Sequence, residues 1–143
     1  MRLLIIVFLL SCSLFGCQTD GNHISDIQWQ LSSYGFQADT KKTVLDGSSY
    51  RIFFAKDDNK VSGSIDCNSF QSTYVINNEK LEIEALAVTE IACPLMVNDD
   101  YLIQTEFIIN ALSTVATFSL SEGQLTLSAV DSSQLIFDEQ QQY

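Results

Sequence analysis

The stretch GSIDCNSFQSTY, residues 63–74, is followed a short way downstream by TEIAC, residues 89–93. The first stretch alternates apolar and polar side chains around a Cys67–Asn68 corner, and the second ends in another cysteine, Cys93. Such alternation is typical of a half-buried strand, and Asn tolerates tight turn conformations. We therefore expect Asn68 to turn the chain so that Cys67 faces the segment that carries Cys93.

The N-terminus has the layout of a secretory signal. Arg2 precedes an unbroken apolar run over residues 3–10, and small residues follow. This run is shorter than the roughly 20 residues that a helix needs to cross a bilayer. The sequence LFGC, residues 14–17, resembles a bacterial lipobox, in which Cys17 would be acylated and become the new N-terminus. The alternative is an ordinary secretory signal with an incidental cysteine.

Lipidation sets the expected domain boundaries and the expected location in the cell envelope. The expected parts are a lipoprotein signal peptide (1–16), a lipidated N-terminus and tether (17–25), a folded domain (26–138) and a polar tail (139–143). Each buried acyl methylene contributes about 0.8 kcal/mol, so several chains hold a protein at a membrane. Gln18 in place of Asp after the acylated cysteine predicts an outer-membrane lipoprotein facing the periplasm, if the cell has two membranes.

The chain is acidic, with 18 Asp and Glu residues against 7 Lys and Arg residues and a formal net charge of −11. Such a surface repels nucleic-acid phosphates and anionic lipid head groups. We therefore expect no nucleic-acid partner, a membrane contact made through the lipid anchor, and a monomer that meets other envelope proteins. The hydrophobic content of 46% is ample for a single packed domain.

Cysteine usage separates a structural role from a chemical one. Processing would remove Cys12 and acylate Cys17, which leaves Cys67 and Cys93. In an oxidising compartment such a pair is more often a structural disulfide than a metal site. The bridge would stabilise the fold by roughly 3 to 4 kcal/mol in the chain-entropy picture, less any strain. A redox role would favour a Cys-x-x-Cys arrangement, which the pair lacks.

Short bursts of period-two alternation, separated by turns rich in Asp, Asn, Gly and Ser, predict antiparallel strands. The predicted strands are residues 27–34, 50–55, 60–65, 73–77, 80–86, 115–121, 124–130 and 134–139. Gly63 indicates a close backbone approach or a bulge within its strand.

One segment follows a helical period instead. Asn98 is placed to cap a helix whose first turn carries Asp99 and Asp100, which favour the positive end of the helix dipole. One stripe is expected to face water: Asp99, Glu106, Asn110 and Ser113. The apolar remainder is expected to lie across a sheet: Tyr101, Ile103, Phe107, Ile108, Ala111 and Leu112. The expected fold class is α+β, a curved antiparallel β-sheet wrapped around one main helix.

These residues together resemble a known family. The pattern consists of Trp29-x-Leu31, Gly63, Cys67-Asn68, Tyr74 and Thr89-x-x-x-Cys93, and is similar to the META domain of HslJ-like bacterial envelope lipoproteins over residues 26–138. Asp66 departs from the Gly that commonly precedes the Cys-Asn pair. The resemblance implies a pseudo-barrel in an exported or outer-membrane-anchored protein, no established catalytic activity, and links to heat shock, antibiotic tolerance and secretion. A similar cracked barrel occurs in pilot lipoproteins that escort secretin subunits.

The sequence offers little for catalysis. Its single histidine, His23, falls in the predicted tether, whereas nucleophilic triads and zinc sites need histidine in a rigid place. The Asp pairs at 57–58 and 99–100 lack the spacing and glycine of a calcium loop. Glu82 and Glu84 share one strand face, which is typical of outward-facing charges. We therefore expect no enzyme activity, no metal and no cofactor.

Aromatic and apolar side chains supply the candidate binding residues. Phe53 and Phe54 are consecutive and must point to opposite faces of a strand. The candidates for an exposed partner surface are Tyr34, Tyr50 and Phe53. The candidates for the lining of an internal cavity are Ile52, Phe54, Val75 and Phe107.

Three functions follow as hypotheses. The first is a non-catalytic, lipid-anchored envelope protein that supports stress tolerance through protein contacts. The second is a carrier or pilot-type lipoprotein that holds an acyl chain or a peptide in the barrel. The third is an inhibitor of an exported protease.

Overall fold

The structure is a computed structural model, and it describes residues 24–91 and 99–140. Within these residues the chain forms ten strands and one helix. The strands are β1 (Gln28–Phe36), β2 (Lys42–Thr43), β3 (Tyr50–Ala55), β4 (Lys60–Ile65), β5 (Asn68–Asn77), β6 (Lys80–Ile83), β7 (Ala87–Val88), β8 (Val115–Ser121), β9 (Gln124–Ala129) and β10 (Ser133–Glu139). The helix is α1 (Asp99–Ser113).

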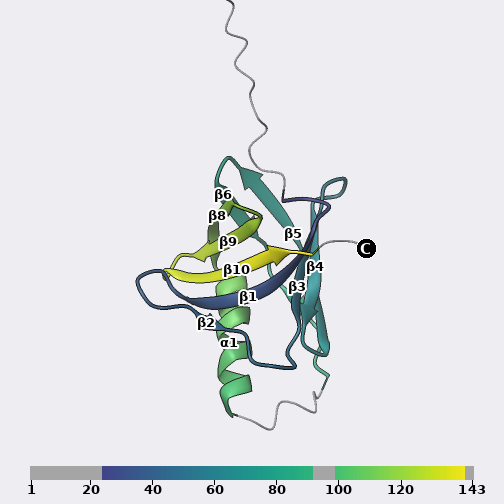
Figure 1. Cartoon of the computed structure of the whole chain (residues 1–143). Coiled ribbons are helices and arrows are strands. Elements are labelled where there is room, and N and C mark those ends of the chain that lie inside the picture. The colour runs from purple at the N-terminus through teal and green to yellow at the C-terminus, as the bar shows by residue number, and fades with distance from the viewer. Residues whose placement is uncertain (1–23, 92–98, 141–143) are drawn as a thin grey trace, which may run out of the picture.

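Eight of the strands close into an antiparallel barrel (Figure 1). The ring runs β1-β3-β4-β5-β6-β8-β9-β10 and returns to β1, while the short strands β2 and β7 pair with β1 and β5 outside it. The closing pair of strands extends from Trp29↔Glu139 to Phe36↔Ser133. The predicted combination of a curved antiparallel sheet and one helix is confirmed in outline. The sheet goes further than the expected pseudo-barrel, because its first and last long strands are hydrogen-bonded to each other.

The barrel interior follows from the alternation of the strands. In β3 the inward positions Tyr50, Ile52 and Phe54 are buried, and the residues between them are exposed or half-buried. Trp29 is also fully buried, and its indole N–H donates to the carbonyl oxygen of Ile24 at 2.9 Å. A buried Trp therefore keeps its polar group satisfied while its ring fills the core.

The folded body is slightly longer than the predicted 26–138. Ile24 is fully buried, and Ser25 forms a parallel bridge with Phe54. At the other end, Glu139 pairs with Trp29 in the barrel closure.

The predicted strands agree with the observed ones to within two residues except beside the motif, and the short strand β2 was not predicted. β5 begins at Asn68, five residues before the predicted start at residue 73, because the corner leads directly into the strand. The predicted strand 80–86 ends at Ile83, and the chain then pairs with β5 again as β7.

Helix α1 begins at Asp99, directly after the predicted cap position, and lies in the predicted orientation except around Ile103 and Gln104. Figure 1 shows it passing behind β10 and β1, with its N-terminal part extending beyond the sheet. The stripe predicted to face water is exposed as expected: Asp99, Glu106, Asn110 and Ser113. The prediction that Ile103 lies across the sheet is wrong, since its side chain is 60% exposed, while Gln104 is fully buried. The predicted cap Asn98 lies outside the described residues.

Candidate functional site

The Cys67–Asn68 motif forms the tight connection between β4 and β5. Ile65 pairs with Asn68, so Asp66 and Cys67 make the turn. Asp66, with φ of 55°, takes the left-handed conformation that Gly favours and that Asp and Asn tolerate. The prediction that Asn68 supplies the turn conformation is therefore wrong, because Asn68 is already extended in β5.

The turn is fastened to the start of β3 by a reciprocal pair of hydrogen bonds. The backbone N–H of Asp66 donates to the carbonyl oxygen of Ser49 at 2.8 Å. The backbone N–H of Ser49 donates to Asp66 Oδ1 at 2.7 Å. Asp at this position thus combines the turn conformation with a side-chain acceptor that glycine would lack.

Asn68 binds the downstream segment that carries the second half of the motif. Its side-chain amide exchanges two hydrogen bonds with the backbone of Ile91, and its Oδ1 also accepts from the hydroxyl of Thr89 at 3.0 Å. The Thr89 hydroxyl oxygen accepts from the backbone N–H of Ser69 at 3.0 Å. Asn68 is buried, so these bonds satisfy groups that water does not reach.

The sulfur atom of Cys67 faces the same segment. Cys67 Sγ lies 3.7 Å from the carbonyl oxygen of Ile91, two residues before Cys93. Cys93 itself lies outside the described residues. The Cys67–Cys93 disulfide therefore stays a prediction, and the position of Ile91 beside Cys67 agrees with it.

Gly63 lies where two neighbouring strands leave no room for a side chain. A Cβ atom at this position would lie 2.0 Å from the carbonyl oxygen of Arg51 and 2.6 Å from the ring of Phe70. Gly63 pairs with Phe70 across the β4–β5 ladder, so the ring covers the backbone of the glycine. The predicted close backbone approach at Gly63 is confirmed.

A buried polar cluster joins α1 to the start of β3. Gln104 Oε1 accepts from the backbone N–H of Leu45 at 2.9 Å, and Gln104 Nε2 donates to the hydroxyl of Tyr50 at 3.0 Å. The Tyr50 hydroxyl is also hydrogen-bonded to Thr105 Oγ1 at 2.9 Å. Burial raises the pKa of Tyr50 well above its ordinary value. The phenol therefore stays neutral at physiological pH and serves to fasten the helix.

An apolar groove of about 550 Å³ lies between the motif and α1. Its walls include Ile65, Val88 and Ile91 on the barrel side and Thr105 and Ile109 on the helix. The groove offers hydrophobic contact and few polar groups, which suits an apolar ligand better than a charged one.

The three residues predicted to form a binding surface, Tyr34, Tyr50 and Phe53, do not form one exposed surface. The prediction that Tyr34 and Tyr50 are exposed is wrong, because both are buried. The ring of Tyr34 packs against Phe107, with centroids 5.2 Å apart, and Tyr50 belongs to the cluster under α1. Phe53 is half-buried on the face opposite Phe54, as strand alternation predicts.

The four residues predicted to line a cavity do not all face the barrel interior. Ile52 and Phe54 are fully buried in the core, and Phe107 is partly buried against it. The prediction for Val75 is wrong, because its side chain is 60% exposed. Val75 follows the inward-facing Tyr74 in β5, so its side chain points out of the barrel.

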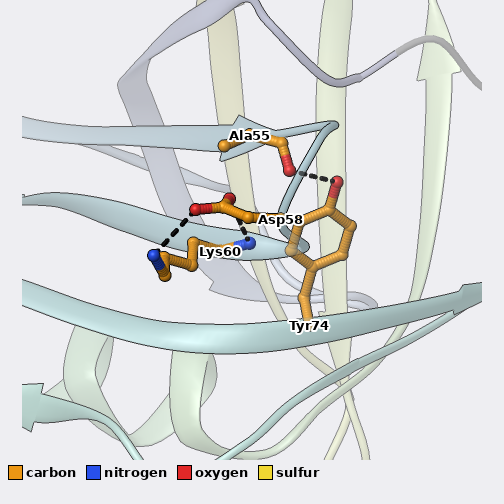
Figure 2. A network of polar contacts seen from close by, with 4 residues as sticks. All are labelled: Ala55, Asp58, Lys60 and Tyr74. Atoms are coloured by element: carbon orange, nitrogen blue, oxygen red, sulfur yellow. Dashed lines mark hydrogen bonds and ion pairs between the residues drawn. The ribbon is translucent and has the colours of Figure 1, made fainter.

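These acidic residues of the barrel lie on its surface and in a turn. Glu82 and Glu84 are exposed while Leu81 and Ile83 are buried, as predicted. Figure 2 shows the β3–β4 turn, where Lys60 forms an ion pair with Asp58 at 2.8 Å. Hydrogen bonding from Lys60 lowers the pKa of the Asp58 carboxyl.

The hydroxyl of Tyr74 ties the same end of the barrel together. It donates to the carbonyl oxygen of Ala55 at 3.2 Å (Figure 2) and is hydrogen-bonded to Ser25 Oγ at 3.1 Å. The hydrogen bonds and the ion pair at this end of the barrel therefore have a structural role. Asp58 and Lys60 lie at its exposed edge.

Across residues 24–91 and 99–140, no three His, Cys, Asp or Glu side chains are grouped so that they could hold a metal ion. The predicted lipidation site Cys17 and the histidine His23 lie outside these ranges. In the same ranges, α1 is too short and too polar to span a membrane.

A closed barrel, a single helix and a corner motif that binds the segment before the helix define a class of small antiparallel barrel domains. The chain belongs to the META domain family, whose pattern it matches over residues 22–142. The sequence matches none of the curated proteins with which it was compared.

Solved structures share this fold at low sequence identity. A protein from Burkholderia xenovorans, determined by NMR, is 21% identical, with a TM-score of 0.67 over 83% of this chain and 85% of that one. A DUF4847 family protein from Bacteroides vulgatus, determined by crystallography, is 14% identical, with a TM-score of 0.61 over 85% of this chain and 97% of that one. These similarities concern the fold alone.

Proposed function

We propose that this protein is a non-catalytic, lipid-anchored protein of the bacterial cell envelope, similar to HslJ-like lipoproteins, that acts through contacts with other proteins. The observation that carries the proposal is the short distance in sequence between the lipobox cysteine and the folded body. Cys17 is followed by residues 18–23, and Ile24 is already fully buried in the barrel.

The length of this link limits how far the barrel can stand from a membrane. Seven Cα–Cα steps separate Cys17 from Ile24, and a fully extended chain covers about 3.5 Å per step, so the link reaches at most about 25 Å. The end of the barrel that holds Ile24, Ser25 and Tyr74 would therefore face the bilayer. The Cys67 corner lies at the opposite end of the β3–β4 hairpin and would face away from it.

The anchor is tested by metabolic labelling with a clickable palmitate. We expect the wild-type chain and Cys12→Ala to be labelled and to sediment with membranes, and Cys17→Ala to lose both properties. Cys12→Ala is the matched control, because it changes a cysteine of the same signal segment. Equal labelling of Cys17→Ala and the wild type would remove the anchor from the proposal.

The role in stress tolerance is tested by gene deletion. A deletion strain is expected to survive heat or antibiotic exposure less well, and the wild-type gene is expected to restore survival. Cys17→Ala is expected to restore it poorly, because the protein would no longer be held at the membrane. Unchanged survival of the deletion strain would contradict this role.

The apolar groove beside α1 supports a second candidate function, a carrier of an acyl chain. Ile109 lies on its helix side, so Ile109→Trp would fill part of it. Lipid extraction and mass spectrometry of the purified full chain is expected to find co-purifying lipid in the wild type and less in the variant. Absence of lipid from the wild type would contradict the carrier function and leave the anchor test unaffected.

A further inference from the structure

Helix α1 carries apolar side chains beside the face that it buries. Leu102 and Ile109 lie at the edge of the buried face; Leu102 is 46% exposed and Ile109 is half-buried. A surface helix normally presents charged or polar residues there. The buried face itself consists of Tyr101, Gln104, Thr105, Ile108, Ala111 and Leu112.

These two apolar residues border the groove between the motif and α1. Thr105 and Ile109 form its helix wall, and both also line a second hollow of about 420 Å³ that continues along α1 to Leu102. We call the combined depression the α1 groove. Its opposite wall includes Ile91, which is 57% exposed. Leu102 and Ile109 are seven residues apart, so the groove follows α1 for about two turns, or about 10 Å.

The rim of the α1 groove is acidic on both sides. Glu90 is exposed on the barrel side, and Glu106 is exposed on the helix side. Asp99, also exposed, lies about two turns before Glu106 on the same side of α1. Among the described residues that line the groove, none is Lys, Arg or His. A matching ligand therefore has apolar atoms at its centre and positive charge at both edges.

This charge pattern discriminates among the occupants that an apolar groove could take. A second copy of the chain would bring acidic surfaces together, since each copy has a formal net charge of −11. An anionic lipid surface would be repelled for the same reason. An acyl chain would gain nothing from Glu90 and Glu106. A basic amphipathic segment of another protein uses both the apolar walls and the acidic rim.

The spacing of residues along α1 favours a helical segment. Leu102, Thr105 and Ile109 recur at intervals of three and four residues, which places them in one row on the helix. Such rows form the ridges and grooves by which two helices pack together. Amphipathic helices bind apolar grooves through side chains at this same spacing.

The position of the groove agrees with a contact away from the membrane. Asn68 lines the groove and directly follows Cys67. In the proposed function, the Cys67 corner faces away from the bilayer. A partner helix would therefore reach the groove without crossing the lipid surface.

We propose that the α1 groove binds an amphipathic helix of another envelope protein, whose apolar stripe is flanked by Lys or Arg. Its apolar side chains pack against Ile91, Leu102 and Ile109. Its basic side chains meet Glu90 and Glu106. The inference rests on the proposed function, to which it gives a contact surface and a class of partner.

The test uses a synthetic peptide, KLLKLLKKLLKLLK, with a photoreactive benzophenone in its apolar stripe. The protein is used as the cell processes it, in nanodiscs of zwitterionic lipid if it is acylated and in buffer if it is not. Mass spectrometry maps the crosslinked residues, which are expected to include Ile91, Leu102 and Ile109. Only peptide attached to the protein is counted, so binding of the peptide to lipid adds no signal.

Two control peptides separate helical docking from simple attraction of charge. LKLKLKLLKLKLKL has the same composition with a strand period, and it should crosslink about tenfold less, because its apolar residues do not form one helical stripe. ELLELLEELLELLE keeps the helical period and reverses the charge. It should not crosslink in the groove, because like charges would meet at the rim.

Two double variants test the site on the protein. Glu90→Lys combined with Glu106→Lys should weaken crosslinking of the basic helix about tenfold, the scale of two exposed charge pairs. The matched control combines Glu84→Lys with Glu122→Lys, which makes the same charge change at exposed positions outside the groove and should behave like the wild type. Unchanged thermal unfolding of both variants would show that the barrel is intact.

Three outcomes would overturn the proposal: no crosslink in the α1 groove, equal crosslinking of the strand-period peptide, or equal weakening by both double variants. A co-purifying lipid that blocks the peptide would also overturn it and would assign the groove to the carrier function. Palmitate labelling of Cys17 and survival of the deletion strain do not depend on the peptide. Failure of the groove and failure of the proposed function are therefore separate results.

Discussion

The side chain of Asn68 pairs with the backbone of Ile91 as a strand neighbour would. Asn68 Oδ1 accepts from the N–H of Ile91 at 2.7 Å, and Asn68 Nδ2 donates to its carbonyl oxygen at 3.2 Å. One amide side chain thus positions the segment that enters Cys93 next to the corner that carries Cys67. The Cys-Asn pair is therefore best understood as a structural device.

Replacement of Asn68 by Ala should leave two backbone groups of Ile91 without these partners. We expect the free energy of unfolding to fall by about 1 to 2 kcal/mol, the net contribution of two hydrogen bonds, because Ile91 is an exposed residue and water can replace the lost partner. Chemical denaturation measures the change. Ser69→Ala, at the exposed neighbouring position, is the control and should change stability little. A wild-type stability for Asn68→Ala would contradict the role of this residue.

The disulfide prediction has a direct readout. Intact mass of the oxidised mature protein should show no free thiol at Cys67 or Cys93. Cys67→Ser should lower the free energy of unfolding by about 3 kcal/mol under oxidising conditions, because the loop would no longer be closed in the unfolded chain. A reducing agent should bring the wild type to the stability of the variant. Detection of two free thiols in the oxidised protein would contradict the disulfide prediction.

Gly63 and Gly47 provide a matched pair of glycine substitutions. Gly63→Ala should destabilise the barrel by about 3 kcal/mol or more, because the new Cβ would overlap the Arg51 carbonyl oxygen and force the strands apart. Gly47 has φ of +85° and open space around it, so Gly47→Ala should cost only backbone strain, about 1 to 2 kcal/mol. Thermal unfolding compares them. Equal losses of thermal stability in the two variants would show that the close backbone contact at Gly63 does not add to the cost of the substitution.

Tyr50 should make the fold sensitive to alkali. Its pKa is raised from an ordinary value of 10.0, chiefly by burial, so the native state favours the neutral phenol. The stability linked to this group is present below about pH 10 and is lost as the pH rises above 10. Denaturation between pH 8 and 12 should show this decline, and Tyr50→Phe should reduce it.

The decline should not vanish entirely in Tyr50→Phe. The pKa of Tyr34 is also raised, first by burial and then by Asp100, so this phenol contributes to the same alkaline loss. At neutral pH the variant should lose about 1 kcal/mol, because Gln104 and Thr105 lose a hydrogen-bond partner. A Tyr50 phenolate titrating near pH 10 in the folded protein, followed by absorbance at 295 nm, would contradict the prediction.

The sequence by itself determined the local elements of this protein. Alternation located strands such as β3 and β4, the helical period located α1, and the outward position of Glu82 followed from the apolar residues beside it. The Cys67–Asn68 and Thr89–Cys93 segments also marked, by residue type alone, the place where the chain is fastened. These features depend on neighbours within a few residues, which periodicity reports directly.

Only the tertiary structure decided how the ends of the chain meet and which polar groups are buried. Barrel closure pairs Trp29 with Glu139, and no local pattern reports a contact between such distant residues. The packing of α1 on the barrel likewise buries Tyr50 and Gln104 together, where their polar groups are hydrogen-bonded to each other.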